Sequence, residues 1–175
     1  MVGQRLVEAL RDRDARRRWR VTVLSEEPRR AYDRVSLSSY FDGATVEDLD
    51  LVPDGCYGNG GYELRLEEAV TGIDRAARTV TTSRGGTIGY DALVLATGSA
   101  PFVPPVPGAG LPGCFAYRTL DDLDAIKEKV AEETAGMTPK QVKAYFAQGA
   151  QKLLQSTGQR LPVRRGRRKV AAAKR

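Results

Sequence analysis

The first 27 residues limit the possible fold more than any other part of the chain. Apolar residues recur at helical spacing between charged ones from Val2 onward, which predicts a helix over residues 2–18. The β-branched run Arg20–Leu24 follows and predicts a short buried strand. The acidic residues Glu26 and Glu27 come directly after that strand. A helix followed by a hydrophobic strand that ends in acid is typical of the second half of a βαβ dinucleotide-binding unit.

The spacing between Gly3 and Glu26 fits the same interpretation. In a βαβ unit the first helix points its N-terminus at a pyrophosphate, and the acid after the second strand bonds a ribose hydroxyl. Glu26 lies 23 residues after Gly3, close to the spacing of about 20 that the glycine fingerprint requires. Gly3 would then be the last glycine of that fingerprint. On spacing alone, other helix–strand folds remain open, and Glu26 could equally be a solvated strand end.

The middle of the chain predicts a series of short strands. Residues 29–54 have mixed polarity with short helical pieces, such as Thr45–Leu49 with Thr45 as its cap. Asp91–Ala96 is a near-continuous apolar run, typical of a parallel strand covered on both faces, and it ends abruptly at Thr97-Gly98. Turn residues separate four further predicted strands, which are Tyr62–Leu66, Ala69–Asp74, Thr79–Ser83 and Thr87–Tyr90.

The last third of the sequence predicts a loop and two helices. Pro101–Pro112 holds five prolines and two glycines, which indicates an extended loop. Leu120–Ala135 has a helical pattern with aspartates in its first turns. Thr138-Pro139 is a strong helix start, and the helix it begins is expected to run to about Ser156. The residues expected to form one apolar stripe on that helix are Val142, Tyr145, Phe146, Leu153 and Leu154.

The charge is divided unevenly along the chain. The net charge of +6 is the sum of two unlike parts. Residues 1–126 hold 15 Lys and Arg against 19 Asp and Glu, whereas residues 127–175 hold 13 against 3. Residues 160–175 carry eight basic and no acidic side chains, a composition typical of disorder. The basic excess therefore says nothing about what the first 126 residues bind.

The sequence lacks the residues that several kinds of chemistry require. The chain has no histidine, which removes His-based acid–base catalysis, Ser-His and Cys-His nucleophile pairs and His-liganded metals. Its two cysteines, Cys56 and Cys114, lie 58 positions apart and form no CxxC pair. We therefore expect no catalytic residue and no metal site. No apolar run approaches the roughly 18 residues of a membrane span, and the N-terminus lacks the pattern of a signal peptide, so we expect a cytoplasmic protein.

An ordered series of short motifs runs from residue 1 to about residue 126. By these motifs the sequence resembles the FAD-binding domain of the flavoprotein oxidoreductases that carry two dinucleotide-binding domains, most closely the assimilatory NAD(P)H nitrite reductase large subunits. The resemblance implies an α/β, Rossmann-like FAD-binding domain. The motifs are Met1-Val2-Gly3-Gln4-Arg5, Glu26-Glu27-Pro28, Ala31-Tyr32-Asp33-Arg34-Val35, Leu37-Ser38-Ser39-Tyr40-Phe41, Tyr90-Asp91-Ala92-Leu93-Val94-Leu95-Ala96-Thr97-Gly98-Ser99 and Tyr117-Arg118-Thr119-Leu120-Asp121-Asp122-Leu123.

The resemblance also implies roles for individual residues. Glu26 would accept the ribose hydroxyls of the FAD adenosine, with Glu27 as the second choice. Arg34 would contact the phosphates or the flavin, for which its planar guanidinium is suited, although an ion pair with Asp33 or another neighbour is the alternative. The backbone of Val70 would meet the adenine edge. In such proteins the flavin itself carries hydride and electrons. The full set of predicted cofactor-binding residues is Gly3, Glu26, Arg34, Val70, Ala96, Thr97 and Gly98.

Three departures from the family limit what the resemblance implies. The opening strand and first two glycines of the fingerprint would precede Met1, so the domain is expected to lack its first strand. No second glycine fingerprint for NAD(P)H follows residue 126. The cysteines for an iron–sulfur or siroheme part are absent. We therefore predict an incomplete FAD domain over residues 1–126, a helical extension over 127–159 and a basic tail over 160–175.

Two other interpretations of the sequence stay open. The basic residues 164–169 could neutralise phosphates, which would make the chain a nucleic-acid or anionic-surface binding protein, but they have no interleaved aromatic residues. The chain could also be an inactive gene remnant. The favoured interpretation is an FAD-binding portion of a nitrite-reductase-like oxidoreductase that a partner chain or a second copy completes, without a membrane or nucleic-acid partner.

Overall fold

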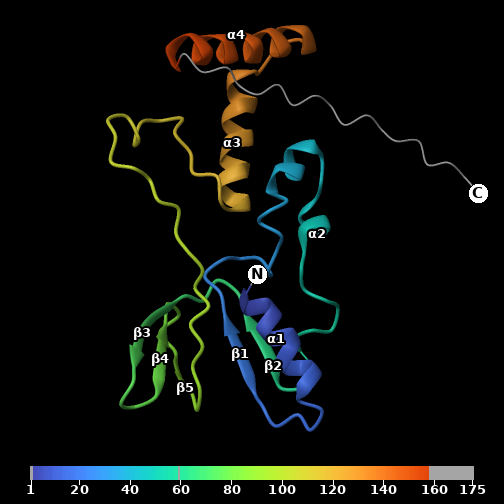
Figure 1. Ribbon diagram of the computed structural model, residues 1–175, viewed down its shortest axis with the longest axis vertical. Helices are drawn as coiled ribbons and strands as arrows, with labels where there is room; N and C mark the ends of the chain where they lie inside the picture. The colour runs from blue at the N-terminus through green and yellow to red at the C-terminus, as the bar shows by residue number, and fades with distance from the viewer. Residues whose placement is uncertain (1, 59, 158–175) are drawn as a thin grey trace, which may run out of the picture. The chain divides into compact units, whose positions relative to one another are not determined.

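The computed structural model describes residues 2–58 and 60–157. The chain divides into two compact units, Met1–Ile126 and Lys127–Arg175. All the strands lie in the first unit (Figure 1). Within the described residues, no helix combines the length and apolar character that a membrane crossing needs.

A helix and two parallel strands form the N-terminal part of the first unit. Helix α1 spans Val2–Arg13, β1 spans Val21–Leu24 and β2 spans Tyr62–Arg65. The two strands pair in parallel, with Val21 opposite Tyr62, and α1 runs alongside them (Figure 1). Burial of the apolar face of α1 against the strands drives this packing. The cluster between them consists of buried Val7, Val52, Cys56 and Tyr62, with Leu10, Val21, Val23, Ala31 and Tyr57 at its edge.

Helix α1 is shorter than the predicted helix over residues 2–18. It ends at Arg13 because the Asp14 carboxylate accepts the backbone N–H groups of Arg18 and Trp19, each at 2.9 Å. These bonds turn the chain back toward β1, and Arg17 in the turn has a positive φ of 48°. The three arginines at positions 16–18 therefore lie beyond the helix and not in its last turn.

The same two hydrogen bonds predict how the stability of the folded protein depends on pH. They hold the pKa of Asp14 below its ordinary value, with the bond from Arg18 as the largest cause and that from Trp19 next. A depressed pKa contributes stability that is present above the unfolded-state pKa, about 3.9, and is lost as the pH falls through the folded-state pKa. We expect Asp14→Asn to lower the urea midpoint at pH 6, with the difference from wild type shrinking below about pH 4.

The matched control for that prediction is Asp54→Asn. Asp54 is exposed in a loop, so its substitution should leave the urea midpoint unchanged at both pH values. A difference between Asp14→Asn and wild type that persists undiminished at pH 2.5, where the carboxyl of the unfolded chain is about fully protonated, would contradict the assigned cause.

A second cluster packs the connection between β1 and β2 against the start of α3. The 3-10 helix η1 spans Leu37–Asp42, and α2 spans Val46–Leu49. The prediction that Thr45 caps the second of these is confirmed, because its hydroxyl accepts the Asp48 N–H while the Asp48 carboxylate accepts the Thr45 N–H. The buried members of the cluster are Tyr32, Leu37, Leu49, Leu120 and Leu123.

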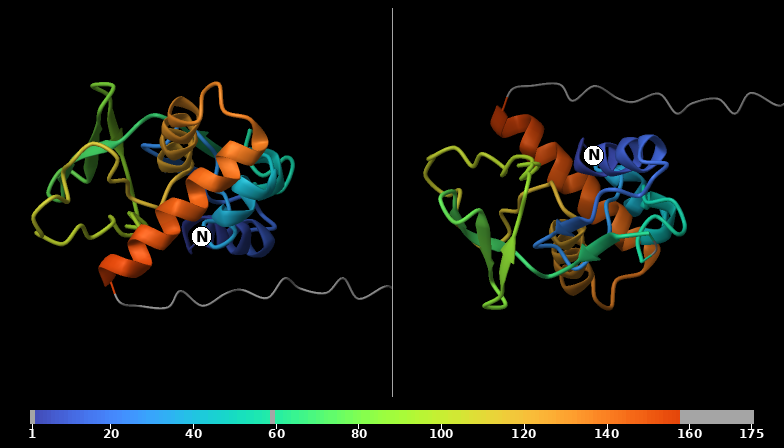
Figure 2. Two further views of the ribbon diagram at one scale, coloured as in Figure 1. Left: turned by 90° about the horizontal axis from the view of Figure 1, so that it is seen from above. Right: turned by 90° about the horizontal axis from the view of Figure 1, so that it is seen from below.

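Three antiparallel strands form a separate sheet. Strand β3 spans Val70–Asp74, β4 spans Thr79–Thr82 and β5 spans Thr87–Gly89. They pair in the order β3-β4-β5, with an irregularity between Val70 and Gly72. Figure 2 shows this green meander apart from the β1–β2 pair. Each predicted strand in this region exists, and each observed end lies within one residue of its prediction.

The predicted strand over Asp91–Ala96 is absent. This segment forms neither helix nor strand, and Leu93, Val94 and Leu95 are 39%, 62% and 69% exposed. A continuous apolar run becomes a parallel strand only when neighbours pair with its edges and cover its faces. Among the described residues the parallel sheet contains β1 and β2 alone, so nothing there pairs with the run. The prediction was wrong because local pattern was taken to imply tertiary partners.

The remaining predicted elements lie near their expected positions. Residues 101–112 contain no helix or strand, in agreement with the expected loop. Helix α3 spans Leu120–Glu133 and α4 spans Pro139–Thr157. On α4, Tyr145 and Phe146 contact each other edge to face but are 36% and 49% exposed. The predicted basic tail over residues 160–175 lies outside the residues that the structure describes.

Candidate functional site

The predicted residues Gly3 and Ala96 lie in direct contact. A Cβ atom placed on Gly3, in the first turn of α1, would stand 3.3 Å from the Ala96 Cβ. Almost any side chain at position 3 would therefore push the two segments apart. The contact brings the segment around Ala96 up to the N-terminus of α1, where unpaired backbone N–H groups and the helix dipole favour an anion.

The turn after Ala96 depends on glycine at position 98 for its backbone conformation. Gly98 has a φ of +70°, a conformation that glycine adopts at no steric cost. The Arg118 guanidinium lies beside it, because a Cβ on Gly98 would be 3.6 Å from Arg118 Nη2. Asp122 fixes this segment by accepting the backbone N–H groups of Arg118 and Thr119 at 2.9 and 2.8 Å.

Arg118 is absent from the residues predicted from sequence. Its position between Tyr117 and Thr119 in the last of the resembling motifs was the available signal. It could not be read as a site residue without the structure, since 20 residues separate it from Gly98 along the chain. The contact adds a cation next to the Ala96-Thr97-Gly98 turn.

Backbone hydrogen bonds tie the loop that carries Glu26 to the end of β2. The Ser25 N–H donates to the Arg65 carbonyl at 3.0 Å, and the Glu68 N–H donates to the Ser25 carbonyl at 2.8 Å. Val70 begins β3 two residues further on and is 43% exposed. Glu26 is itself exposed, and within the described residues its carboxylate shows no hydrogen bond or ion pair.

Arg34 is held in a cluster with Glu27 and Tyr32. Its Nη2 forms an ion pair with Glu27 Oε1, and its guanidinium carbon lies 5.2 Å from the centroid of the Tyr32 ring. The Tyr32 hydroxyl donates to Glu27 Oε2 at 2.8 Å. Arg34 Nε is buried and has no hydrogen-bond partner among the described residues. The alternative partner predicted for Arg34, Asp33, instead accepts from Val35 and Ser36.

The surroundings of Tyr32 keep its hydroxyl protonated. Burial, followed by the hydrogen bond to Glu27, raises the pKa of Tyr32 to about 12. Near neutral pH the hydroxyl is therefore a donor to the carboxylate. It also accepts the Leu120 backbone N–H at 3.4 Å.

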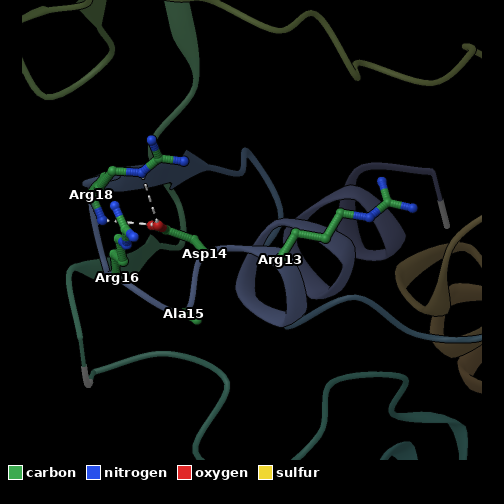
Figure 3. A pocket seen from close by; sticks show the side chains of 5 residues that line it. All are labelled: Arg13, Asp14, Ala15, Arg16 and Arg18. Carbon is green, nitrogen blue, oxygen red and sulfur yellow. Dashed lines mark hydrogen bonds and ion pairs between the residues drawn. The ribbon is translucent and has the colours of Figure 1, made fainter.

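Two pockets in the described part of the chain are lined by none of these residues. One, of about 200 Å³, is lined by Arg13, Asp14, Ala15, Arg16 and Arg18 (Figure 3). The other, of about 260 Å³, is lined by Arg30, Pro53, Gly55, Cys56, Tyr57, Leu64 and Leu66. Both are smaller than the roughly 300–1,000 Å³ of ordinary ligand pockets. In the first, the Asp14 carboxylate serves the turn after α1, so this pocket is a consequence of local folding.

The structure brings some predicted residues together and leaves others apart. Gly3 meets Ala96, and Gly98 meets Arg118. Among the described residues, no hydrogen bond or ion pair joins Glu26, Arg34 or Val70 to another of the three. Over the same residues, no group of three or more His, Cys, Asp or Glu side chains could hold a metal ion. Cys56 is buried and Cys114 is exposed, both as free thiols.

The family profile of the pyridine nucleotide-disulphide oxidoreductases matches residues 6–143. The chain belongs to this family. Proteins of this family are FAD-binding flavoproteins, so the predicted family and cofactor class are confirmed. The alternatives of a nucleic-acid-binding protein and an inactive remnant find no support in these comparisons.

Several of the curated relatives that the chain matches are nitrite reductases. The chain is 50% identical over 137 residues to the nitrite reductase [NAD(P)H] large subunit of Klebsiella oxytoca. It is 45% identical over 127 residues to the nitrite reductase (NADH) large subunit of Escherichia coli K12. These matches cover 78% and 73% of this chain but only 14% and 15% of the relatives.

A solved flavoprotein of the family has the same fold. The structure of a ferredoxin reductase from Rhodopseudomonas palustris aligns with a TM-score of 0.63 at 26% identity, and the match covers 73% of this chain and 31% of the reductase. The predicted α/β, Rossmann-like fold is therefore confirmed. In this chain, the fold is represented by α1, the β1–β2 pair and the β3–β5 meander.

Proposed function

We propose that this chain binds FAD and forms the flavin-binding portion of an NAD(P)H-dependent oxidoreductase of the nitrite reductase large-subunit type. The observation that carries the proposal is the close approach of Gly3 to Ala96. It packs the first turn of α1 closely against the turn at residues 96–98, as the last glycine of a dinucleotide fingerprint does, and so places the anion-binding N-terminus of the helix beside that turn.

The residues present fit the adenosine and phosphate parts of FAD. Glu26 is an exposed carboxylate after a parallel strand and would accept ribose hydroxyls. The Val70 backbone, at the start of β3, would meet the adenine edge. Gly3, Ala96, Thr97 and Gly98 would let the backbone approach the phosphates. When bound, FAD would supply the capacity to accept and release hydride and electrons.

Arg34 would also contact FAD. Its buried Nε is an unused donor, and burying a donor without a partner costs about 1–3 kcal/mol. An anionic oxygen of the cofactor would satisfy it. Arg118 would add a second cation near Gly98. The chain itself would bind and orient the cofactor and would supply no acid–base group to the chemistry.

The domain organisation follows from the same proposal. Residues 1–126 would be the FAD-binding part, and residues 127–159 a helical extension. We propose that NAD(P)H and the electron acceptor bind outside residues 1–126, with a completing chain or a second copy as the partner. We place the protein in the cytoplasm, where NAD(P)H is available.

The test is FAD titration of the full chain by quenching of flavin fluorescence. Wild-type protein should bind FAD saturably. Glu26→Gln should weaken binding about 10- to 150-fold, because a hydrogen bond to a charged group contributes about 1.5–3 kcal/mol. The matched control is Glu128→Gln, which removes an exposed carboxylate from α3 and should bind like wild type.

Two outcomes would contradict the proposal. Absence of saturable binding by the wild-type chain would remove FAD binding altogether. An affinity of Glu26→Gln equal to that of Glu128→Gln would remove the ribose role of Glu26 and leave FAD binding in place.

A further inference from the structure

Arg34 is held in place by contacts within the chain. The ion pair from Nη2 to Glu27 holds one edge of the guanidinium. The Tyr32 ring covers one face at 5.2 Å. The Nε atom is buried without a hydrogen-bond partner among the described residues. A cation that is held on two sides and keeps one unused donor is arranged to bind an acceptor that comes from outside the chain.

Glu27 is itself held at both its side chain and its backbone. Its Oε1 contacts Arg34 and its Oε2 accepts the Tyr32 hydroxyl at 2.8 Å. Its backbone N–H donates to Ser25 Oγ at 3.3 Å, and its carbonyl accepts the Glu67 N–H at 3.2 Å. Both carboxylate oxygens are therefore engaged within the protein. This separates Glu27 from its exposed neighbour Glu26, although the two acids are adjacent in the sequence.

Tyr32 connects this pair to the core. The tyrosine is 2% exposed and belongs to the cluster with Leu120 and Leu123. Its hydroxyl donates to Glu27 and accepts the Leu120 N–H at 3.4 Å. The position of the Glu27 carboxylate, and through it that of Arg34, is thus set by a residue that cannot move without disturbing the core.

We propose that Glu27 and Tyr32 are positioning residues that hold the Arg34 guanidinium with Nε–H free to donate to an anionic oxygen of FAD. The inference rests on the proposed FAD binding and assigns Glu27 a different role from the ribose acid. A carboxylate beside Arg34 also lowers the positive potential that a phosphate meets. Positioning and charge competition therefore predict opposite effects of removing the Glu27 charge.

The experiment is a double-mutant cycle in the full chain, with the dissociation constant of FAD as the readout. Glu27→Gln should weaken FAD binding about tenfold, because a long side chain that is no longer held must be ordered on binding. In the Arg34→Ala background the same substitution should cause no further loss, since it acts through Arg34. Tyr32→Phe keeps the ring and removes the hydroxyl, and it should weaken binding in the same Arg34-dependent way.

The control variant removes a carboxylate–arginine pair elsewhere. Glu63→Gln breaks the exposed pair between Glu63 and Arg65 on β2 and should leave FAD binding unchanged. A second readout needs no cofactor. In ¹⁵N-arginine-labelled protein, the Arg34 Nε–H resonance should exchange with solvent slowly in wild type and rapidly in Glu27→Gln, while the thermal unfolding curves show that both are folded.

The outcomes separate this inference from the proposed function. Failure of wild type to bind FAD would overturn the proposed function, and this inference with it. If wild type binds FAD, then equal or tighter binding by Glu27→Gln would overturn the positioning role alone. An undiminished loss in the Arg34→Ala background would also overturn it, because the effect would then not pass through Arg34. Should Glu27→Gln fail to fold, Tyr32→Phe decides the same question in the same cycle.

Discussion

Replacing Leu120 with alanine is expected to lower the free energy of unfolding by about 2–5 kcal/mol. The Leu120 side chain is fully buried at the start of α3. It packs in the cluster that contains Tyr32, Leu37, Leu49 and Leu123. The substitution removes buried methyl groups and leaves a cavity that neighbouring side chains fill only in part, so both losses add. Urea unfolding of the full chain, followed by far-UV circular dichroism, measures the effect.

The matched control is Leu111→Ala. Leu111 is 63% exposed, so the same chemical change should alter the free energy of unfolding by no more than about 0.5 kcal/mol. If Leu120→Ala is already unfolded without urea, the direction of the effect is established at once. Equal urea midpoints for the two variants would contradict the assignment of Leu120 to the core.

Replacing Gly3 with valine is expected to weaken FAD binding by about tenfold or more. A Cβ at this position would lie 3.3 Å from the Ala96 Cβ, and the branched side chain adds further atoms on the same side. Inserting atoms into a packed contact costs about 1–3 kcal/mol, which corresponds to about 5- to 150-fold in affinity if the bound state carries the strain. The measurement is the dissociation constant of FAD by fluorescence titration.

Gly149→Val provides the control for this prediction. Gly149 lies within α4, and a Cβ there would meet nothing within 4 Å. Both substitutions place a β-branched residue in a helix, so their effects on helix propensity are similar. Only the contact with Ala96 distinguishes them. Equal FAD affinities for Gly3→Val and Gly149→Val would show that this contact does not shape the binding site.

Elements whose structure depends on residues close by in the sequence were predicted well. The turn glycines and β-branched runs located β3, β4 and β5 to within one residue. The capping box at Thr45 was identifiable because its partner lies three residues away. The start of α4 at Pro139 followed from the fixed φ of proline. In each case the interactions that determine the structure lie within a few positions along the chain.

Predictions that required distant partners were less accurate. The Arg-rich run after α1 has helical character, but the Asp14 carboxylate ends the helix by accepting two backbone N–H groups ahead of it. The run Asp91–Ala96 has the composition of a buried strand and is not one, because no described strand pairs with it. The residue pattern of a segment indicates the secondary structure that the segment favours. Whether that structure forms depends on the segments that lie next to it in the folded protein.

The same difference between local sequence and distant partners applies to the candidate site. The sequence by itself determined the family and the α/β fold, because motifs in a fixed order carry that information, and it predicted Gly3, Glu26, Arg34 and Gly98 as candidate residues. Only the tertiary structure distinguished Glu26 from Glu27. Two adjacent carboxylates look alike in a sequence, but hydrogen bonds from Tyr32 and Arg34 engage one of them and leave the other exposed. The physical reason is that the energy of a carboxylate depends on the donors around it in space, and its neighbours in sequence do not specify those donors.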